Sequence, residues 1–195
     1  MNDESRPMTV NEARALMHEW VESPSLRGHM EAVAACMNHH GALHAPDEVD
    51  AWTIAGLLHD FDYERHPTME EHPMVGVAHL RTLGVDDSII QAILGHAPYT
   101  GVARTTPMAR HLFACDELAG FIVAVARVRP NGFEGLKAKS VRKKLKDKGF
   151  AAAVSRSDIS EGVQDLVEDG CVTDDSEHID RCIAAIAEAS ERVLG

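Results

Sequence analysis

The chain has few positive charges, and this deficit limits the partners we expect for it. Its 195 residues include 31 acidic and 19 basic side chains, which gives a formal net charge of −12 at pH 7. A strongly acidic protein repels the phosphate backbone, so we expect no general nucleic-acid binding. The composition, with 45% hydrophobic and 26% charged residues, is that of a folded globular protein with one sizeable core.

Long apolar runs and paired cysteines are also missing. No stretch approaches the roughly 20 apolar residues of a membrane span, so we expect no membrane partner. The start of the chain, Met1 to Arg6, lacks the apolar segment of a secretory signal, and we expect a cytoplasmic protein. None of the four cysteines has Cys-x-x-Cys spacing, which predicts free thiols. They are Cys36, Cys115, Cys171 and Cys182.

The sequence has no long alternation of apolar and polar residues, so no sheet is predicted. Its periodicity is helical almost throughout and predicts an all-α fold. We expect helices over about 9–21, 26–40, 47–60, 68–84, 86–96 and 108–127. A turn at 130–132 precedes three or four more helices. We expect residues 1–130 to form a helical core and 131–195 to form a C-terminal helical extension packed on it, as one domain overall.

Histidine is the residue that the chain has in excess, with twelve in total. Some of these histidines have a structural or surface interpretation. A helix end next to Gly41 carries three that we expect at the surface: His39, His40 and His44. Four others lie in amphipathic segments with no obvious partner, and we expect them to be structural or to face solvent. These are His18, His79, His111 and His178.

The most informative feature is the pair His59-Asp60, which ends the apolar run from Trp52 to Leu58. A polar pair is costly to place against a core unless something binds it. Imidazole and carboxylate together suit a borderline divalent metal.

Four further residues occupy comparable places in their own apolar segments, namely His29, His72, His96 and Asp116. Their spacings match neither a zinc finger nor an H-E-x-x-H helix. They are typical of several helices that each deliver one or two ligands to the interior of a bundle. We therefore expect one or two divalent ions, with iron or manganese as first choices and zinc, cobalt, nickel or magnesium as alternatives.

The order His, His-Asp, His, His, Asp resembles the HD superfamily of metal-dependent phosphohydrolases over about residues 25–127. The resemblance implies an HD-type helical bundle with an interior metal site. It implies that one metal is bound by the first histidine, the His-Asp pair and the last aspartate, which here are His29, His59, Asp60 and Asp116. Members with two further histidines hold a second metal. Those histidines would be His72 and His96, with Asp60 as the bridge.

Within that superfamily, Ala97 stands where HD-GYP phosphodiesterases usually have another histidine, and no Gly-Tyr-Pro motif follows. Cleavage of cyclic dinucleotides is therefore disfavoured. The loop from His96 to Gly101 and the helix up to Asp116 resemble the diadenosine tetraphosphate hydrolases. The segment from Ala119 to Lys148 is similar to bacterial HD proteins described only as hydrolases.

The resemblance implies a phosphohydrolase that acts through metal-activated water on a nucleotide or another small phosphorylated metabolite, either a monoester or a diester. Asp60 and His59 would be its catalytic residues. A basic segment, 137–148, carries +6 in an acidic chain and suggests phosphate contacts. The expected substrate contacts are Lys139, Lys144, Arg127 and Arg104.

Two other functions remain open for the same ligand set. A di-iron HD-type oxygenase would use these ligands to cleave a C–C or C–P bond with oxygen. A non-catalytic HD module would only bind a nucleotide. Iron content with oxygen consumption would distinguish the oxygenase, and nucleotide binding without metal dependence would distinguish the binding module. The oligomeric state is open as well.

Overall fold

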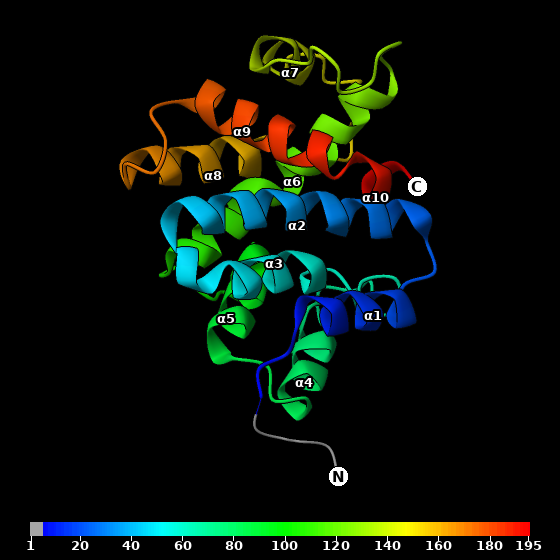
Figure 1. The fold of residues 1–195 in the computed structure, drawn as a ribbon, viewed down its shortest axis with the longest axis vertical. Coiled ribbons are helices and arrows are strands. Elements are labelled where there is room, and N and C mark those ends of the chain that lie inside the picture. The colour runs from blue at the N-terminus through cyan, green and yellow to red at the C-terminus, as the bar shows by residue number, and fades with distance from the viewer. Residues whose placement is uncertain (1–5) are drawn as a thin grey trace.

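The computed structural model of the protein describes residues 6–195 and is all-helical over that range (Figure 1). Residues 1–5, on which the expectation of no secretory signal partly rests, lie outside the described part. The helices are α1 (Val10–Trp20), α2 (Pro24–His44), α3 (Val49–Leu58), α4 (Met74–Thr82), α5 (Asp87–His96), α6 (Pro107–Arg127), α7 (Ala138–Leu145), α8 (Arg156–Glu168), α9 (Asp175–Glu188) and α10 (Ser190–Leu194). Two short 3₁₀ turns, Pro46–Glu48 and Pro98–Thr100, precede α3 and α6.

The long helix α2 crosses the middle of the molecule and organises the rest (Figure 1). It packs against α3 on one side and against α6 and α9 on the other. Helix α6 in turn contacts α5 and α8, and α1 packs on α3. This arrangement brings α2, α3, α5 and α6 together around one interior region.

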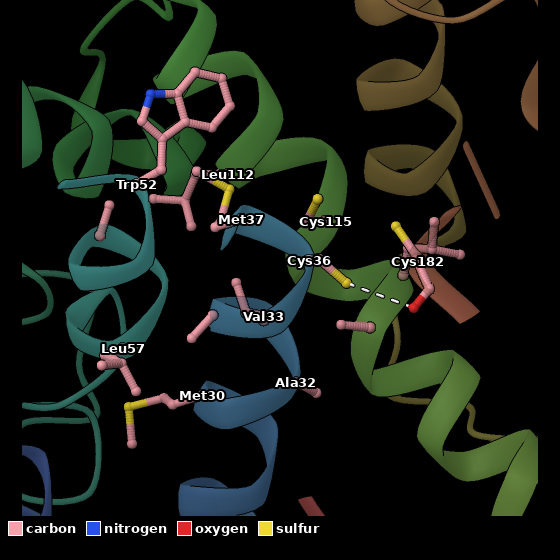
Figure 2. Packing of buried hydrophobic residues seen from close by; sticks show 14 of the residues in the cluster. Met30, Ala32, Val33, Cys36, Met37, Trp52, Leu57, Leu112, Cys115 and Cys182 are labelled. Carbon is pink, nitrogen blue, oxygen red and sulfur yellow. Dashed lines mark hydrogen bonds between the residues drawn. The ribbon is translucent and has the colours of Figure 1, made fainter. Parts of the chain in front are cut away.

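One large apolar cluster runs through the whole described chain, from Ala13 in α1 to Val193 in α10. Figure 2 shows part of it, where Met30, Val33 and Met37 of α2 face side chains of α3. Residues on both sides of the turn at 130–132 contribute, since the buried face of α9 belongs to the same cluster. None of the helices within 6–195 has the length and apolarity that crossing a membrane would require.

Helices α2 and α3 approach closely because Gly56 has no side chain. A Cβ at this position would lie 2.6 Å from the Cα of Ala34, which is far inside van der Waals contact. Gly56 therefore sets the distance between α2, which carries His29, and α3, which His59 directly follows.

Capping side chains account for two helix starts, which lie within a residue of the expected positions 9 and 86. Thr9 forms a reciprocal capping box with Glu12, and the side chain of Asp86 accepts a hydrogen bond from the backbone of Ser88. The long helix predicted over 108–127 is confirmed at Pro107–Arg127.

Four predicted boundaries were wrong. Helix α2 begins at Pro24, two residues before the expected start at 26, and the missing N–H of a proline costs nothing at the first position of a helix. Helix α2 also continues past Gly41 to His44. Asp47 makes no capping hydrogen bond and lies in a 3₁₀ turn, and α4 begins at Met74, because 68–73 form turns.

Candidate metal centre

The six residues expected as ligands lie together in the interior, delivered by five segments. His29 is in α2, His59 and Asp60 follow the last turn of α3, and Asp116 is in the middle of α6. His72 precedes α4, and His96 is the last residue of α5. Their donor atoms form two groups in which all atoms lie within 4.8 Å of one another. We call His29, His59 and Asp116 the first trio, and Asp60, His72 and His96 the second trio.

The first trio is compact. Nε2 of His29 lies 3.2 Å from Nε2 of His59 and 3.1 Å from Oδ1 of Asp116. Nε2 of His59 is 3.4 Å from the same carboxylate oxygen. These separations match the roughly 3.0–3.4 Å between neighbouring ligands of an ion bound at about 2.1 Å. The arrangement therefore fits a single ion with three ligands.

Asp60 belongs to the second trio, but its two carboxylate oxygens face both trios. Its Oδ1 lies 3.2 Å from Nε2 of His72 and 3.3 Å from Nε2 of His96. Its Oδ2 faces the other way, 3.6 Å from His59 and 3.8 Å from His29. One carboxylate thus offers one oxygen to each of two adjacent ion positions.

Hydrogen bonds on the far side of the rings fix the orientation of three of the histidines. Nδ1 of His59 donates to the carbonyl of Gly56 at 2.8 Å, and Nδ1 of His96 donates to the carbonyl of Ile93. Nδ1 of His72 donates to Asp62 at 2.7 Å. Each ring therefore directs Nε2 to the centre, and a carbonyl or carboxylate that holds the far nitrogen is the support typical of metal-ligating histidines.

The charges of the centre are strongly coupled. Burial alone would lower the pKa of His59, but Asp60 and Asp116 outweigh burial and raise that pKa to about 9. Burial likewise opposes protonation of His72, yet its bonds to Asp60 and Asp62 raise the pKa to about 9. Burial would raise the pKa of both Asp60 and Asp116, but the histidines hold both values well below the ordinary range. Two carboxylates are therefore kept ionised in the interior and need positive charge beside them.

The centre opens into a cavity of about 650 Å³. Five of the six residues line it, and His59 is completely buried behind them. Tyr63, Tyr99 and Phe113 contribute aromatic side chains to its lining, and Ala153 and Val154 line it as well. Burial and the nearby carboxylates raise the pKa of Tyr99 to about 12, so its hydroxyl remains a hydrogen-bond donor.

The four basic residues expected at the substrate do not line this cavity. Arg104 pairs with Glu161 and lies over the ring of Phe113. Lys144 contacts Asp147 and Phe150, and Lys139 and Arg127 are exposed on α7 and at the end of α6. Their role as substrate contacts stays a prediction.

The sequence interpretation missed the role of Asp62. Asp62 is not among the residues expected at the site, yet its side chain is completely buried. Besides His72, it accepts a hydrogen bond from the backbone N–H of Gly76 at 2.7 Å. Its position two residues after Asp60 gave no signal, because the partner histidine is ten residues away in a turn.

The described chain, residues 6–195, also corrects the expectation for His40. We expected this residue at the surface, but its side chain is fully buried because α2 continues for a further turn to His44. His44 itself is exposed, as expected.

In comparisons with known proteins, no family model, no curated protein and no solved structure matches this chain.

Proposed function

We propose that the protein is an HD-type, metal-dependent phosphohydrolase that acts on a nucleotide or another small phosphorylated metabolite. The observation that carries this proposal is the orientation of Asp60, whose Oδ1 faces the two histidines of the second trio and whose Oδ2 faces the histidines of the first. A carboxylate in this position is suited to bridge two ions, and paired ions are a recurrent solution for phosphoryl transfer to water.

The donor set fits such ions. Four imidazole nitrogens and two carboxylates favour iron, manganese, cobalt or zinc over magnesium alone. When bound, two divalent ions would lower the pKa of a coordinated water and neutralise charge on the phosphoryl oxygens. His29, His59 and Asp116 would hold one ion, His72 and His96 the other, and Asp60 both.

The cavity supports a small substrate. Its volume of about 650 Å³ lies within the roughly 300–1,000 Å³ of small-molecule sites. The hydroxyl of Tyr99 is a hydrogen-bond donor at its wall, and Phe113 offers an apolar surface. Its lining within 6–195 contains neither lysine nor arginine, so side chains of the lining do not supply fixed positive charge to an anionic substrate.

The test is a measurement of metal content followed by a panel of phosphomonoesters, phosphodiesters and nucleoside phosphates. We expect about two ions at this centre and metal-dependent release of phosphate or a phosphorylated product. The Asp60→Ala variant should lose turnover, whereas Asp50→Ala, an exposed aspartate on α3, should retain it.

The same samples discriminate the rival functions. Bound iron with oxygen consumption and without phosphate release would indicate an oxygenase and not a hydrolase. Nucleotide binding that survives metal removal, without turnover, would indicate a binding module. Turnover unchanged in a folded Asp60→Ala variant would contradict the assignment of this site.

A further inference from the structure

A second cluster of metal-binding side chains lies outside the centre described above. His40 of α2, Cys115 of α6, and His178 and Cys182 of α9 are all completely buried. Each offers one donor atom, and these four atoms lie within 4.8 Å of one another. Figure 2 shows Cys115 and Cys182 close together where α6 and α9 meet α2.

His40 is the unusual member of this cluster. Neither of its ring nitrogens has a hydrogen-bond partner among residues 6–195, although both are shielded from solvent. A buried imidazole without partners costs free energy, because it loses its hydrogen bonds to water on folding. Its ring lies 5.1 Å from that of His178, measured between centroids. A metal ion between these rings would satisfy one of the nitrogens of His40.

His178 is oriented as a ligand would be. Its Nε2 lies 3.1 Å from the carbonyl oxygen of Ala114 and donates to it, which leaves the lone pair of Nδ1 free. Sγ of Cys182, one helical turn later on the same face, lies 4.0 Å from Nδ1 and 3.8 Å from Nε2. A backbone carbonyl that fixes the far nitrogen of a histidine is the usual outer support of a metal ligand.

Two thiols and two imidazoles are the donor set of closed, tetrahedral zinc sites. With Zn–S near 2.3 Å and Zn–N near 2.0–2.1 Å, neighbouring donors stand roughly 3.4–3.8 Å apart. The donors here lie within 4.8 Å of one another, so a pair at that limit would have to approach by about 1.0–1.4 Å. Complete burial of all four leaves no open position for a substrate.

We propose that His40, Cys115, His178 and Cys182 form a second, structural metal site that binds Zn²⁺ and joins α2, α6 and α9. The proposal does not depend on the activity of the first centre. Cys36 lies beside the cluster, with Sγ 3.9 Å from the carbonyl of Cys182 (Figure 2), and is a neighbour rather than one of the four ligands.

A competing nitrogen-only group shares one residue with this site. His40, His44 and His111 also bring donor atoms within 4.8 Å, but His44 is exposed and this group contains no thiol. Thiolate ligation therefore distinguishes the two groups, and it also distinguishes the proposed site from the first centre.

The experiment is cobalt substitution of the reduced protein in the Asp60→Ala background. Co²⁺ bound by thiolates gives a charge-transfer absorption that nitrogen and oxygen ligands do not produce. We expect one equivalent of Co²⁺ with this absorption, displaced by Zn²⁺. Cys115→Ser and Cys182→Ser should each lose most of it. Cys171→Ser, which alters a cysteine outside the cluster, should keep it.

Zinc-edge X-ray absorption of the unmutated protein gives a readout that needs no variant to fold. Mixed sulfur and nitrogen ligation supports the proposal. Folded, reduced protein that binds Co²⁺ without the thiolate absorption would overturn it, as would absorption that survives both serine substitutions. Loss of the bound ion in His44→Ala, without any thiolate signal, would assign the ion to the nitrogen-only group instead.

Discussion

Asp62 determines which nitrogen His72 presents to Asp60. It accepts the Nδ1 proton of His72 at 2.7 Å, while Nε2 of the same ring lies 3.2 Å from Oδ1 of Asp60. The position of the second trio thus depends on a carboxylate that does not itself face the centre.

Asp62→Asn should weaken metal binding at the second trio only. Asparagine is neutral and keeps only one acceptor oxygen. It therefore cannot accept hydrogen bonds from both Gly76 and His72, and the ring of His72 is held less firmly. Loss of such an outer partner typically costs about 10–100-fold in affinity. Titration with a competing chelator, in which the two ions are followed separately, measures the affinity for each ion. Equal weakening of both ions would show that Asp62 acts on the fold and not on His72.

Removal of single ligands should change metal stoichiometry in a specific way. His72→Ala should lose one ion, because only the second trio contains this residue. Asp60→Ala should lose both, because its two oxygens face both trios. Metal analysis of dialysed protein gives the number of ions, with Asp50→Ala as the unaffected control. Unchanged content in both ligand variants would refute the centre.

Metal uptake should release protons and should strengthen as the pH rises to about 9. His59 and His72 have pKa values near 9 in the metal-free protein, so both carry a proton at pH 7 that an ion must displace. Calorimetry in buffers of different ionisation enthalpy counts these protons, and His72→Ala should release one fewer. Uptake without proton release would contradict the charge coupling described above.

The same two pKa values affect the stability of the metal-free protein. Both pKa values lie above the unfolded value of about 6.5. The two histidines therefore make their full contribution to the free energy of unfolding below that pH. It is lost as the pH rises through about 9. Urea unfolding of metal-free protein at pH 6 and pH 9.5 should therefore show lower stability at the higher pH, and bound metal should diminish this difference.

Gly56→Ala should destabilise the protein and move apart α2 and α3, which position His29 and His59. The added methyl group would overlap the backbone of Ala34, and overpacking of this kind costs about 1–3 kcal/mol. The free energy of unfolding measures this cost. Gly149→Ala is a suitable control, since its Cβ would lie 3.6 Å from the nearest atom and should change little.

Local signals in the sequence accounted for much of the fold. The helix starts at Thr9 and Asp86 were predicted because a cap and its partner lie within three residues. The start of α2 was expected two residues too late, at 26, because proline both ends helices and begins them, and only the preceding cap, Ser23, decides between the two. The start of α4 was placed too early because Thr68 and Glu71 form a capping-like pair in a turn.

The contacts that assemble the two sites from distant parts of the chain were harder to predict from the sequence. The six residues of the first centre were found through their order along the chain, but the division into two trios around Asp60 depends on how five segments pack. The cluster at His40 gave no signal, because its members are separated by up to 142 positions and include only one local pair, His178 and Cys182. Burial of His40 follows from the length of α2, which Gly41 concealed.

Cys115 and Asp116 are consecutive residues of α6, and they serve different clusters. Neighbouring side chains leave a helix about 100° apart, so one turn of α6 would carry a ligand for each of two ions. An ion held by Cys115 would restrict rotation of this helix and preorganise Asp116 for the other ion. Because equilibrium coupling is reciprocal, each ion would then raise the affinity for the other by the same factor. A cell short of zinc would in that case also deplete the first centre of its own metal.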